Sequence, residues 1–368
     1  MRIRVFGQVN ILGGGVHFRE FTDATRRFVS DVVPLESIDR LDPLAMRRAS
    51  ESSTPQDVNI WFWPKEESIP FNGFNVVWAI FESSRLPPSY LRLLAQHDSV
   101  WVPSDWGRDV LIRNGVDAGV IDVVPEGVNP AKFHPHFRKP PDADDEVFRF
   151  LAVGKFESRK GYEELFDAFA RAFDGNERVR LVIKGDYFID HGRKRKELES
   201  AVRERNMPNV DLLFGSWSDI ALLGLYSSVD SFVFPSRAEG WGLPLIEALA
   251  VGLPCISTNY SGHSHYLHAI PGLYREISHT MVRIDDADYL TYWPELLGAE
   301  DAVWAKANVE NLATGLLDMV ERRKDWSEKA LAASGVVRQR FAWDVAVDAA
   351  FSSLHARDVL RVRIGVGL

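Results

Sequence analysis

The chain has 368 residues, of which 46% are hydrophobic and 26% charged, and these ordinary proportions exclude disordered and fibrous proteins. At roughly 150 residues per domain, this length predicts about two domains. The net charge of −9 argues against a nucleic-acid partner, because surfaces that bind nucleic acid carry excess positive charge. The only cysteine, Cys255, can form neither an internal disulfide nor a cysteine zinc site, so we expect a reducing, cytoplasmic location.

The N-terminal segment MRIRVFGQVNILGGG combines basic residues with an apolar run, as signal peptides do. Gln8 and Asn10 interrupt the run, so we predict a buried first strand that ends in a glycine turn at 13–15. No run approaches about 18 apolar residues, which argues against a membrane-spanning helix. Segment 193–205 is densely charged and predicts a solvated helix; the alternative is contact with a membrane surface.

Apolar runs alternate with amphipathic segments along the chain, a pattern typical of layered α/β proteins with parallel sheets. In the first half, we predict strands at 2–6, 59–63, 75–80, 99–102 and 121–124, and helices at 18–28 and 106–113. The acidic, proline-rich segment 135–146 predicts a domain linker. In the second half, we predict strands at 148–155, 178–186, 210–215, 231–235 and 254–258, and helices at 162–173, 193–205 and 244–251.

A glycine run, Gly13-Gly14-Gly15, lies between the first strand and the first helix, where backbone N–H groups can face an anion. The alternative interpretation is a structural tight turn. The spacing does not fit G-x-G-x-x-G, which disfavours nicotinamide binding and a dehydrogenase. His17 follows the run, and histidines in this position more often cap or pack than catalyse.

The most informative segment is 234–257, FPSRAEGWGLPLIEALAVGLPCIS. Glu239 and Glu247 bracket a glycine-rich helix start, which offers N–H donors to an anion and carboxylates to hydroxyl groups. A ligand that carries both a phosphate and several hydroxyls would satisfy both kinds of group. The alternative is a capped helix with solvated glutamates, but Gly240 and Gly242 favour a close approach of the backbone to a ligand.

Two lysines, Lys155 and Lys160, flank a loop that follows the strand at 148–155. This is the edge at which open α/β sheets bind ligands. Two cations there would neutralise a diphosphate that gains charge as it leaves.

Together these motifs resemble the retaining glycosyltransferases of family 4, which have the GT-B fold. The matching pattern runs from Val153 to Thr258, and segments 100–116, 123–135 and 341–343 resemble further parts of the family. The resemblance implies two Rossmann-like domains whose parallel sheets face a deep interdomain cleft. Residues 1–140 would form the acceptor-binding domain and 147–340 the donor domain, with 341–368 returning to the first domain.

The resemblance also assigns roles to individual residues. The implied catalytic residues are Glu239, which would bind the donor sugar, and Lys160 and Lys155, which would bind the diphosphate. The implied donor-binding residues are Gly14, Gly15, Gly185, Asp186, Gly215, Gly240, Trp241, Gly242, Leu243 and Glu247, the last of them on the ribose hydroxyls.

One departure from the family lies at Phe81-Glu82, where many members carry a histidine close to the donor sugar. Either Glu82 contacts the sugar or the acceptor, or His17 takes over that polar role. The form F-E-S-x-R-L-P at 81–87 resembles a subgroup that acts in bacterial surface-polysaccharide synthesis.

The resemblance implies transfer of a hexose to a hydroxyl of a glycan or lipid-linked acceptor, with retention of configuration. GDP-mannose is the first expected donor and a UDP-hexose the second, with at most peripheral contact at the inner face of the cell membrane. We expect no metal or other cofactor, because the acidic runs 142–145 and 285–288 are interpreted as solvated loops. The alternatives are a GT-B epimerase or phosphorylase and a non-catalytic protein that binds nucleotide sugars.

Overall fold

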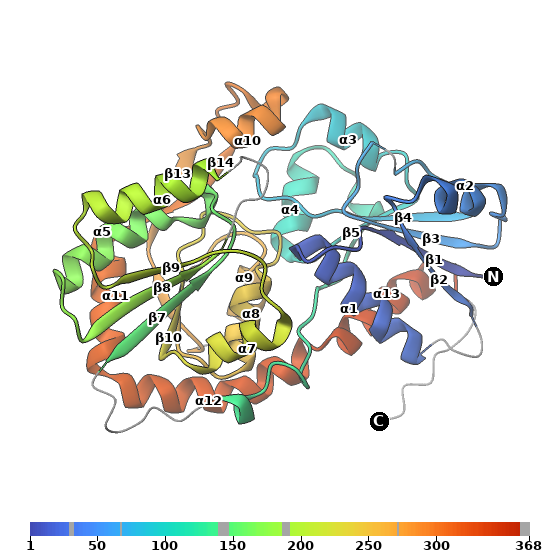
Figure 1. The fold of residues 1–368 in the computed structure, drawn as a ribbon. Coiled ribbons are helices and arrows are strands. Elements are labelled where there is room, and N and C mark those ends of the chain that lie inside the picture. Colours follow the sequence, from blue (N-terminus) through green and yellow to red (C-terminus); the bar gives the residue numbers. More distant parts are fainter. Residues whose placement is uncertain (29–32, 67, 139–146, 186–191, 271, 361–368) are drawn as a thin grey trace. The chain divides into compact units, whose positions relative to one another are not determined.

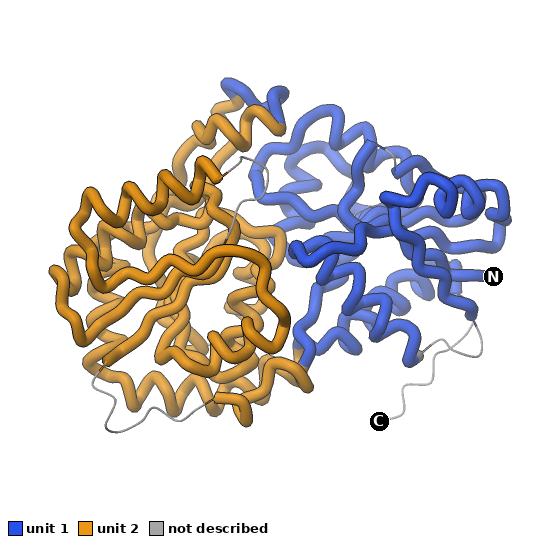
Figure 2. Tube along the Cα trace, viewed as in Figure 1, with its two compact units in different colours: residues 1–129, 293–298, 341–368 blue, residues 130–292, 299–340 orange. Residues whose placement is uncertain are grey.

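The computed structural model describes residues 1–28, 33–66, 68–138, 147–185, 192–270 and 272–360 (Figure 1). The chain divides into two compact units, which Figure 2 shows in different colours. Unit 1 comprises Met1–Asn129, Trp293–Gly298 and the chain from Phe341 onward, and unit 2 comprises Pro130–Tyr292 and Ala299–Arg340. Unit 2 therefore includes residues 135–138 of the predicted linker, while 139–146 lie outside the described residues.

Unit 1 contains a parallel six-stranded sheet in the order β2-β1-β3-β4-β5-β6. In chain order the strands are β1 (Ile3–Gly7), β2 (Leu35–Asp39), β3 (Val58–Phe62), β4 (Phe74–Trp78), β5 (Ser99–Val102) and β6 (Ile121–Val123). The helices are α1 (Gly13–Phe28), α2 (Pro43–Glu51), α3 (Pro88–Leu94), α4 (Asp105–Arg113) and α13 (Trp343–Ala356). Figure 1 shows α1 and α13 beneath this sheet and α2 and α3 above it.

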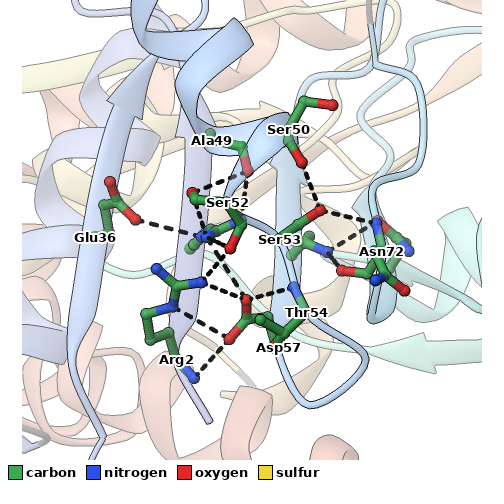
Figure 3. Close-up of polar contacts among 12 residues, drawn as sticks. Arg2, Glu36, Ala49, Ser50, Ser52, Ser53, Thr54, Asp57 and Asn72 are labelled. Carbon is green, nitrogen blue, oxygen red and sulfur yellow. Dashed lines mark hydrogen bonds and ion pairs between the residues drawn. The ribbon is translucent and has the colours of Figure 1, made fainter.

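A buried polar network closes the amino-terminal end of this sheet (Figure 3). Arg4 on β1 is fully buried and donates to the carbonyl oxygen of Ala49 at 2.7 Å. Asp57 accepts from the Arg2 guanidinium at 2.8 Å and lies 3.6 Å from that of Arg4. Burial raises the pKa of Asp57, but the hydrogen bonds from Arg2 and Thr54 and the two positive charges lower it to about 2. The network thus balances the charge of an arginine inside the sheet.

Unit 2 contains a second parallel six-stranded sheet, in the order β12-β11-β10-β7-β8-β9. In chain order its strands are β7 (Phe148–Val153), β8 (Val179–Lys184), β9 (Val210–Leu213), β10 (Ser231–Phe234), β11 (Cys255–Thr258) and β12 (Arg275–Ile277). The helices are α5 (Tyr162–Phe173), α6 (Arg193–Glu204), α7 (Asp219–Ser227), α8 (Leu243–Ala250), α9 (Ser264–Ala269), α10 (Ala287–Tyr292), α11 (Val309–Glu321) and α12 (Arg323–Arg340). An antiparallel pair, β13 (His279–Arg283) and β14 (Val303–Ala307), stands apart from the main sheet.

The core of unit 2 follows from the apolar pattern of α5. Leu165, Phe166, Phe169 and Phe173 recur at helical spacing and are all buried against β7, β8 and α11. The predicted helix 162–173 is confirmed to the residue, and the predicted strands of both halves lie within about two residues of the observed ones. Sequence analysis missed the helices α2, α3, α7, α9, α10, α11 and α12 and the strands β2, β12, β13 and β14.

One local prediction is wrong. The glycines 13–15 form the first turn of α1, whereas β1 already ends at Gly7, so the connecting loop is 8–12. A Cβ on Gly15 would lie 2.1 Å from the carbonyl oxygen of Asn10, so this close approach requires glycine in the helix. Among the helices that the structure describes, none combines the length and apolar character needed to cross a bilayer.

Candidate functional site

The candidate site lies at one edge of the sheet of unit 2, where four neighbouring strands end. Lys155 follows β7, Gly185 follows β8, Gly215 follows β9 and Glu239 follows β10. Because all these strands are parallel, their carboxyl ends meet at the same edge. This is the edge at which open α/β sheets bind ligands, so the structure brings the predicted residues of this unit to one place.

A buried ion pair forms the centre of the site. Nζ of Lys160 lies 2.6 Å from Oε1 of Glu239, and both side chains are almost fully buried. The Ser236 hydroxyl donates to the same oxygen, and the Arg159 guanidinium lies 3.1 Å from Oε2. Burial raises the pKa of Glu239, but the charges of Lys160 and Arg159 lower it to about 2. The carboxylate is therefore ionised over the whole physiological range.

The loop that carries the lysines docks onto the end of β10. It contains a short 3₁₀ turn, η3 (Ser158–Lys160), followed by Gly161 at φ +70°. A Cβ on Gly161 would lie 2.2 Å from the carbonyl oxygen of Pro235, so glycine is required for this docking. Lys155 lies at the other end of the loop and is 44% exposed, with Nζ 3.7 Å from Oε1 of Glu157. The two predicted lysines thus differ: one is buried against Glu239 and one faces solvent.

The glycine-rich segment after Glu239 leads into the start of α8. Gly242 is the N-terminal capping residue at φ +89°, and its carbonyl oxygen accepts from the Tyr266 hydroxyl at 3.0 Å. Trp241 is buried, and its ring makes an edge contact with that of Tyr266. A Cβ on Gly262 would lie 1.8 Å from the carbonyl oxygen of Gly240, so two backbone segments meet closely here. This packing holds the start of α8 in place, where Pro244 has no N–H group and the N–H groups of Leu245 and Ile246 donate to the carbonyl oxygen of Gly242 at 3.0 and 3.3 Å.

Glu247 lies one turn further along α8 and is also buried. Its Oε2 accepts from the hydroxyl of Tyr226 on α7 at 3.0 Å. Burial and the nearby carboxylate raise the pKa of Tyr226 well above its usual value, so the tyrosine remains a proton donor. Glu247, which the sequence predicts to bind the ribose, is therefore oriented by Tyr226, a residue that sequence analysis did not single out.

Gly185 and Gly215 extend the same edge. A Cβ on Gly185 would lie 2.0 Å from the carbonyl oxygen of Gly154, which directly precedes Lys155. The carbonyl oxygen of Gly215 accepts from Nζ of Lys184 at 2.7 Å. Asp186, the remaining residue predicted for this region, lies outside the described residues.

Four predicted residues belong to unit 1. Gly14 and Gly15 lie in the first turn of α1 rather than in a loop. His17 is fully buried, with its ring against those of Phe62, Trp78 and Trp343. Burial lowers the pKa of His17 well below its usual value, which fits the packing role that the sequence also allowed. Glu82 is half-buried in the segment after β4, and a sugar or acceptor contact for either residue stays a prediction.

In the acidic run 285–288, Asp285 is exposed as predicted, whereas Asp286 and Asp288 are half-buried and paired. Asp286 accepts a hydrogen bond from the Ser158 hydroxyl, and Asp288 pairs with Nζ of Lys194 at 2.6 Å. The run therefore ties α10 to the lysine loop and to α6. Within the described residues there is no group of three or more His, Cys, Asp or Glu side chains placed to hold a metal ion, and independence from metal stays a prediction.

The site lies within a segment of the chain that resembles known proteins. Residues 134–269 match the family model described as glycosyl transferases group 1. The D-inositol 3-phosphate glycosyltransferase of Pseudarthrobacter chlorophenolicus is 31% identical over 177 residues, which cover 46% of this chain and 41% of that protein. The mannosylfructose-phosphate synthase of Agrobacterium fabrum is 26% identical over 248 residues, covering 60% of this chain and 54% of that protein. The chain thus spans about half the length of these relatives.

Solved structures resemble the whole chain. A glycosyltransferase from Rickettsia africae superposes with a TM-score of 0.70 at 15% identity and covers 98% of both chains. The Anabaena protein HepE in complex with UDP and glucose superposes with a TM-score of 0.69 at 15% identity, covering 97% of this chain and all of that one. The chain has the GT-B fold.

The GT-B fold confirms the predicted α/β class with two parallel sheets. In this GT-B chain, the family match contains Lys155, Lys160, Glu239 and Glu247. The predicted residues of unit 1 lie outside that match. Arg159 and Tyr226 lie within it, and sequence analysis gave neither a role because their partners are distant along the chain.

Proposed function

We propose that the protein is a glycosyltransferase that moves a hexose from a nucleotide-sugar donor to a hydroxyl group of an acceptor. The observation that carries the proposal is the buried Lys160–Glu239 pair at the sheet edge, directly before the fixed, glycine-rich start of α8. This arrangement offers a cation and the N–H groups of segment 240–243 to a diphosphate, with carboxylates beside them for sugar hydroxyls. The family match over residues 134–269 and the GT-B fold support the same activity.

In this proposal each end of the donor has its own ligands. Glu239 accepts hydrogen bonds from hydroxyls of the donor sugar, and Glu247, held by Tyr226, accepts them from the ribose. The N–H groups of Gly240, Trp241, Gly242 and Leu243 bind the sugar and the diphosphate, and the base lies near Gly185 and Gly215. The polar ligands of the donor would thus come from four neighbouring strand ends of one sheet.

We propose that transfer retains the configuration of the sugar. The bond between the anomeric carbon and the diphosphate oxygen breaks, and the acceptor oxygen bonds to the same face of that carbon. The acceptor proton passes to the departing phosphate oxygen, so no separate protein base is needed. Lys160 and Lys155 stabilise the charge that develops on the diphosphate. Because Lys155 is the more exposed, it can reach a ligand without breaking a buried contact.

For the donor we propose GDP-mannose first and a UDP-hexose second. Mannosylfructose-phosphate synthase among the relatives supports the first choice, and HepE with bound UDP and glucose supports the second. For the acceptor we propose a glycan or a lipid-linked sugar, with at most peripheral contact between the protein and a membrane. We also propose that the reaction needs no metal ion, so that EDTA leaves the rate unchanged.

A thermal-shift panel of nucleotide sugars followed by product analysis tests the proposal. The true donor should raise the melting temperature by mass action, and UDP-glucose, UDP-galactose and GDP-mannose form the first panel. The expected products are a nucleoside diphosphate and a new glycoside. A donor epimer or a sugar phosphate would instead identify an epimerase or a phosphorylase. Stabilisation without turnover over a broad acceptor panel would identify a binding protein.

A further inference from the structure

The buried carboxylate of Glu239 has three side-chain partners with unequal freedom to leave it. In the part of the chain that the structure describes, Nζ of Lys160 makes its hydrogen bond to Glu239 alone. The Arg159 guanidinium, in contrast, also donates to the carbonyl oxygen of Ala238 at 2.6 Å and to Oε2 of Glu157 at 2.8 Å. The Arg159 guanidinium is therefore held by three polar contacts, whereas Nζ of Lys160 has one hydrogen bond and lies 5.7 Å from the ring centroid of Phe234.

The main chain of Arg159 strengthens this anchoring. Its carbonyl oxygen accepts from the backbone N–H of Arg237 at 2.7 Å, so residue 159 is joined to the loop after β10 through both backbone and side chain. Arg159 is 7% exposed, and its guanidinium lies between two carboxylates. A ligand could recruit this arginine only by breaking several buried hydrogen bonds at once.

When Lys160 turns to a ligand, the buried Glu239 carboxylate loses one of its two cationic partners. A buried carboxylate that loses a cationic partner becomes strongly unfavourable unless another charge compensates it. Oε1 of Glu239 would keep the Ser236 hydroxyl, and Oε2 would keep the Arg159 guanidinium. Arg159 thus supplies the charge that would keep Glu239 ionised and in place while Lys160 is engaged elsewhere.

We propose that Arg159 is a positioning residue: it holds the Glu239 carboxylate ionised and oriented so that Lys160 is free to pair with the diphosphate of the donor. This inference rests on the proposed function for the ligand that Lys160 meets. Arg159 itself touches no part of the donor. Glu157, on its far side, completes the alternating series Lys155, Glu157, Arg159, Glu239 and Lys160, in which each carboxylate lies between two cations.

The first test compares Arg159→Met and Arg159→Lys with Arg180→Met, which removes an arginine from a partly exposed pair with Asp211 in the same unit. Arg159→Met should lower kcat about tenfold at neutral pH while KM for the donor changes less than about threefold. Its kcat should fall further as pH is lowered, because the pKa of Glu239 rises once this cation is lost. Two other titratable groups interact with this carboxylate, the buried His263, with its pKa lowered to about 4, and the Tyr162 hydroxyl, with its pKa raised; both are present in the wild type and the variant alike. Arg159→Lys should recover part of the loss, and Arg180→Met should match the wild type.

The outcome that overturns the proposal is a pH profile for Arg159→Met that parallels the wild type, whatever the size of the rate loss. A merely structural arginine would lower the rate equally at every pH. Equal losses in the methionine and lysine variants would also contradict a role based on charge.

A second measurement needs no catalysis. Melting temperatures of Arg159→Met, Glu239→Gln and the double variant form a cycle, in which removal of Arg159 should cost less once Glu239 is neutral. Additive shifts would refute the role of Arg159 even in an active enzyme. A coupled cycle in a protein that transfers no sugar would refute the proposed function and leave the Arg159–Glu239 linkage standing.

Discussion

Nζ of Lys160 and Oε1 of Glu239 lie 2.6 Å apart, so the predicted diphosphate ligand and the predicted sugar ligand neutralise each other at the edge of one sheet. The pair is buried, and its carboxylate is shared with Arg159. In our account, a donor enters by replacing part of this contact with its own phosphate and hydroxyl groups.

Removal of the buried lysine should reduce turnover strongly. Lys160→Ala should lower kcat by about 10²–10³-fold, by analogy with the loss of one donor from an oxyanion hole. Lys196→Ala, which removes an exposed lysine of α6, is the matched control and should leave kcat unchanged. Initial rates of nucleoside diphosphate release measure both variants. A loss below about tenfold would contradict the assigned role of Lys160.

Because of Glu239, the free energy of unfolding should depend strongly on pH in the acidic range. Its pKa in the folded state is about 2 against a usual value of 4.5. Because the folded pKa is depressed, the stabilisation is complete above the usual value and is lost as pH falls toward about 2. The free energy of unfolding should therefore fall more steeply over this interval in the wild type than in Glu239→Gln. Parallel curves from chemical denaturation would show that Glu239 has an ordinary pKa.

Loss of the Tyr226 hydroxyl should weaken nucleotide binding and spare the chemistry. Tyr226→Phe should raise the Kd for the matching nucleoside diphosphate about tenfold, because a hydrogen bond to a charged group is lost. The kcat should change little, since the ribose takes no part in bond making. Tyr274→Phe removes a comparable, exposed contact with Glu276 and serves as the control. Calorimetric titration measures the Kd of both variants, and equal values would show that Tyr226 does not contribute to ribose binding.

The network in unit 1 should govern stability and not activity. Asp57→Asn removes the carboxylate that Arg2 contacts at 2.8 Å and one of the two carboxylates beside the buried Arg4, which keeps Glu36 at 3.3 Å, and this should lower the free energy of unfolding by about 1.5–3 kcal/mol. Asp211→Asn breaks a partly exposed pair with Arg180 and should cost less than about 1 kcal/mol. Because the pKa of Asp57 is depressed from 3.8 to about 2, its contribution persists above pH 3.8 and is lost below it. Urea titrations of both variants give the comparison.

Sequence patterns predict the central strands because such strands are buried on both faces. Strands such as β7 and β8 therefore contain uninterrupted apolar runs, at 150–153 and 181–183. The sheet-edge strand β2, with the sequence LESID, buries only Ile38, and β13 has no fully buried residue, so neither shows a run of this kind. The glycines of α1 illustrate a different limit. Gly15 is required because the loop 8–12 folds back and brings the carbonyl oxygen of Asn10 against it, and the sequence does not show this approach.

In the candidate site too, the sequence predicts some relationships between residues and not others. Glu239 and Glu247 belong to one continuous strand, loop and helix, so their spacing along the chain already predicts their relationship. The partners of these glutamates are distant in sequence: Lys160 and Glu239 are 79 positions apart, and Tyr226 and Glu247 are 21 apart. Residue type alone could not separate Arg159, which holds Glu239, from an ordinary solvated arginine.

The most direct test of the account is the stereochemistry of the product. The wild-type chain is incubated with the donor that stabilises it and a panel of glycan and lipid-linked acceptors, and NMR gives the configuration of each new glycosidic bond. Our account predicts one nucleoside diphosphate released for each glycoside formed, with the configuration of the donor retained and with Lys160→Ala slowing both products together. Inverted products, or nucleoside diphosphate released with only free sugar in every mixture, would contradict it.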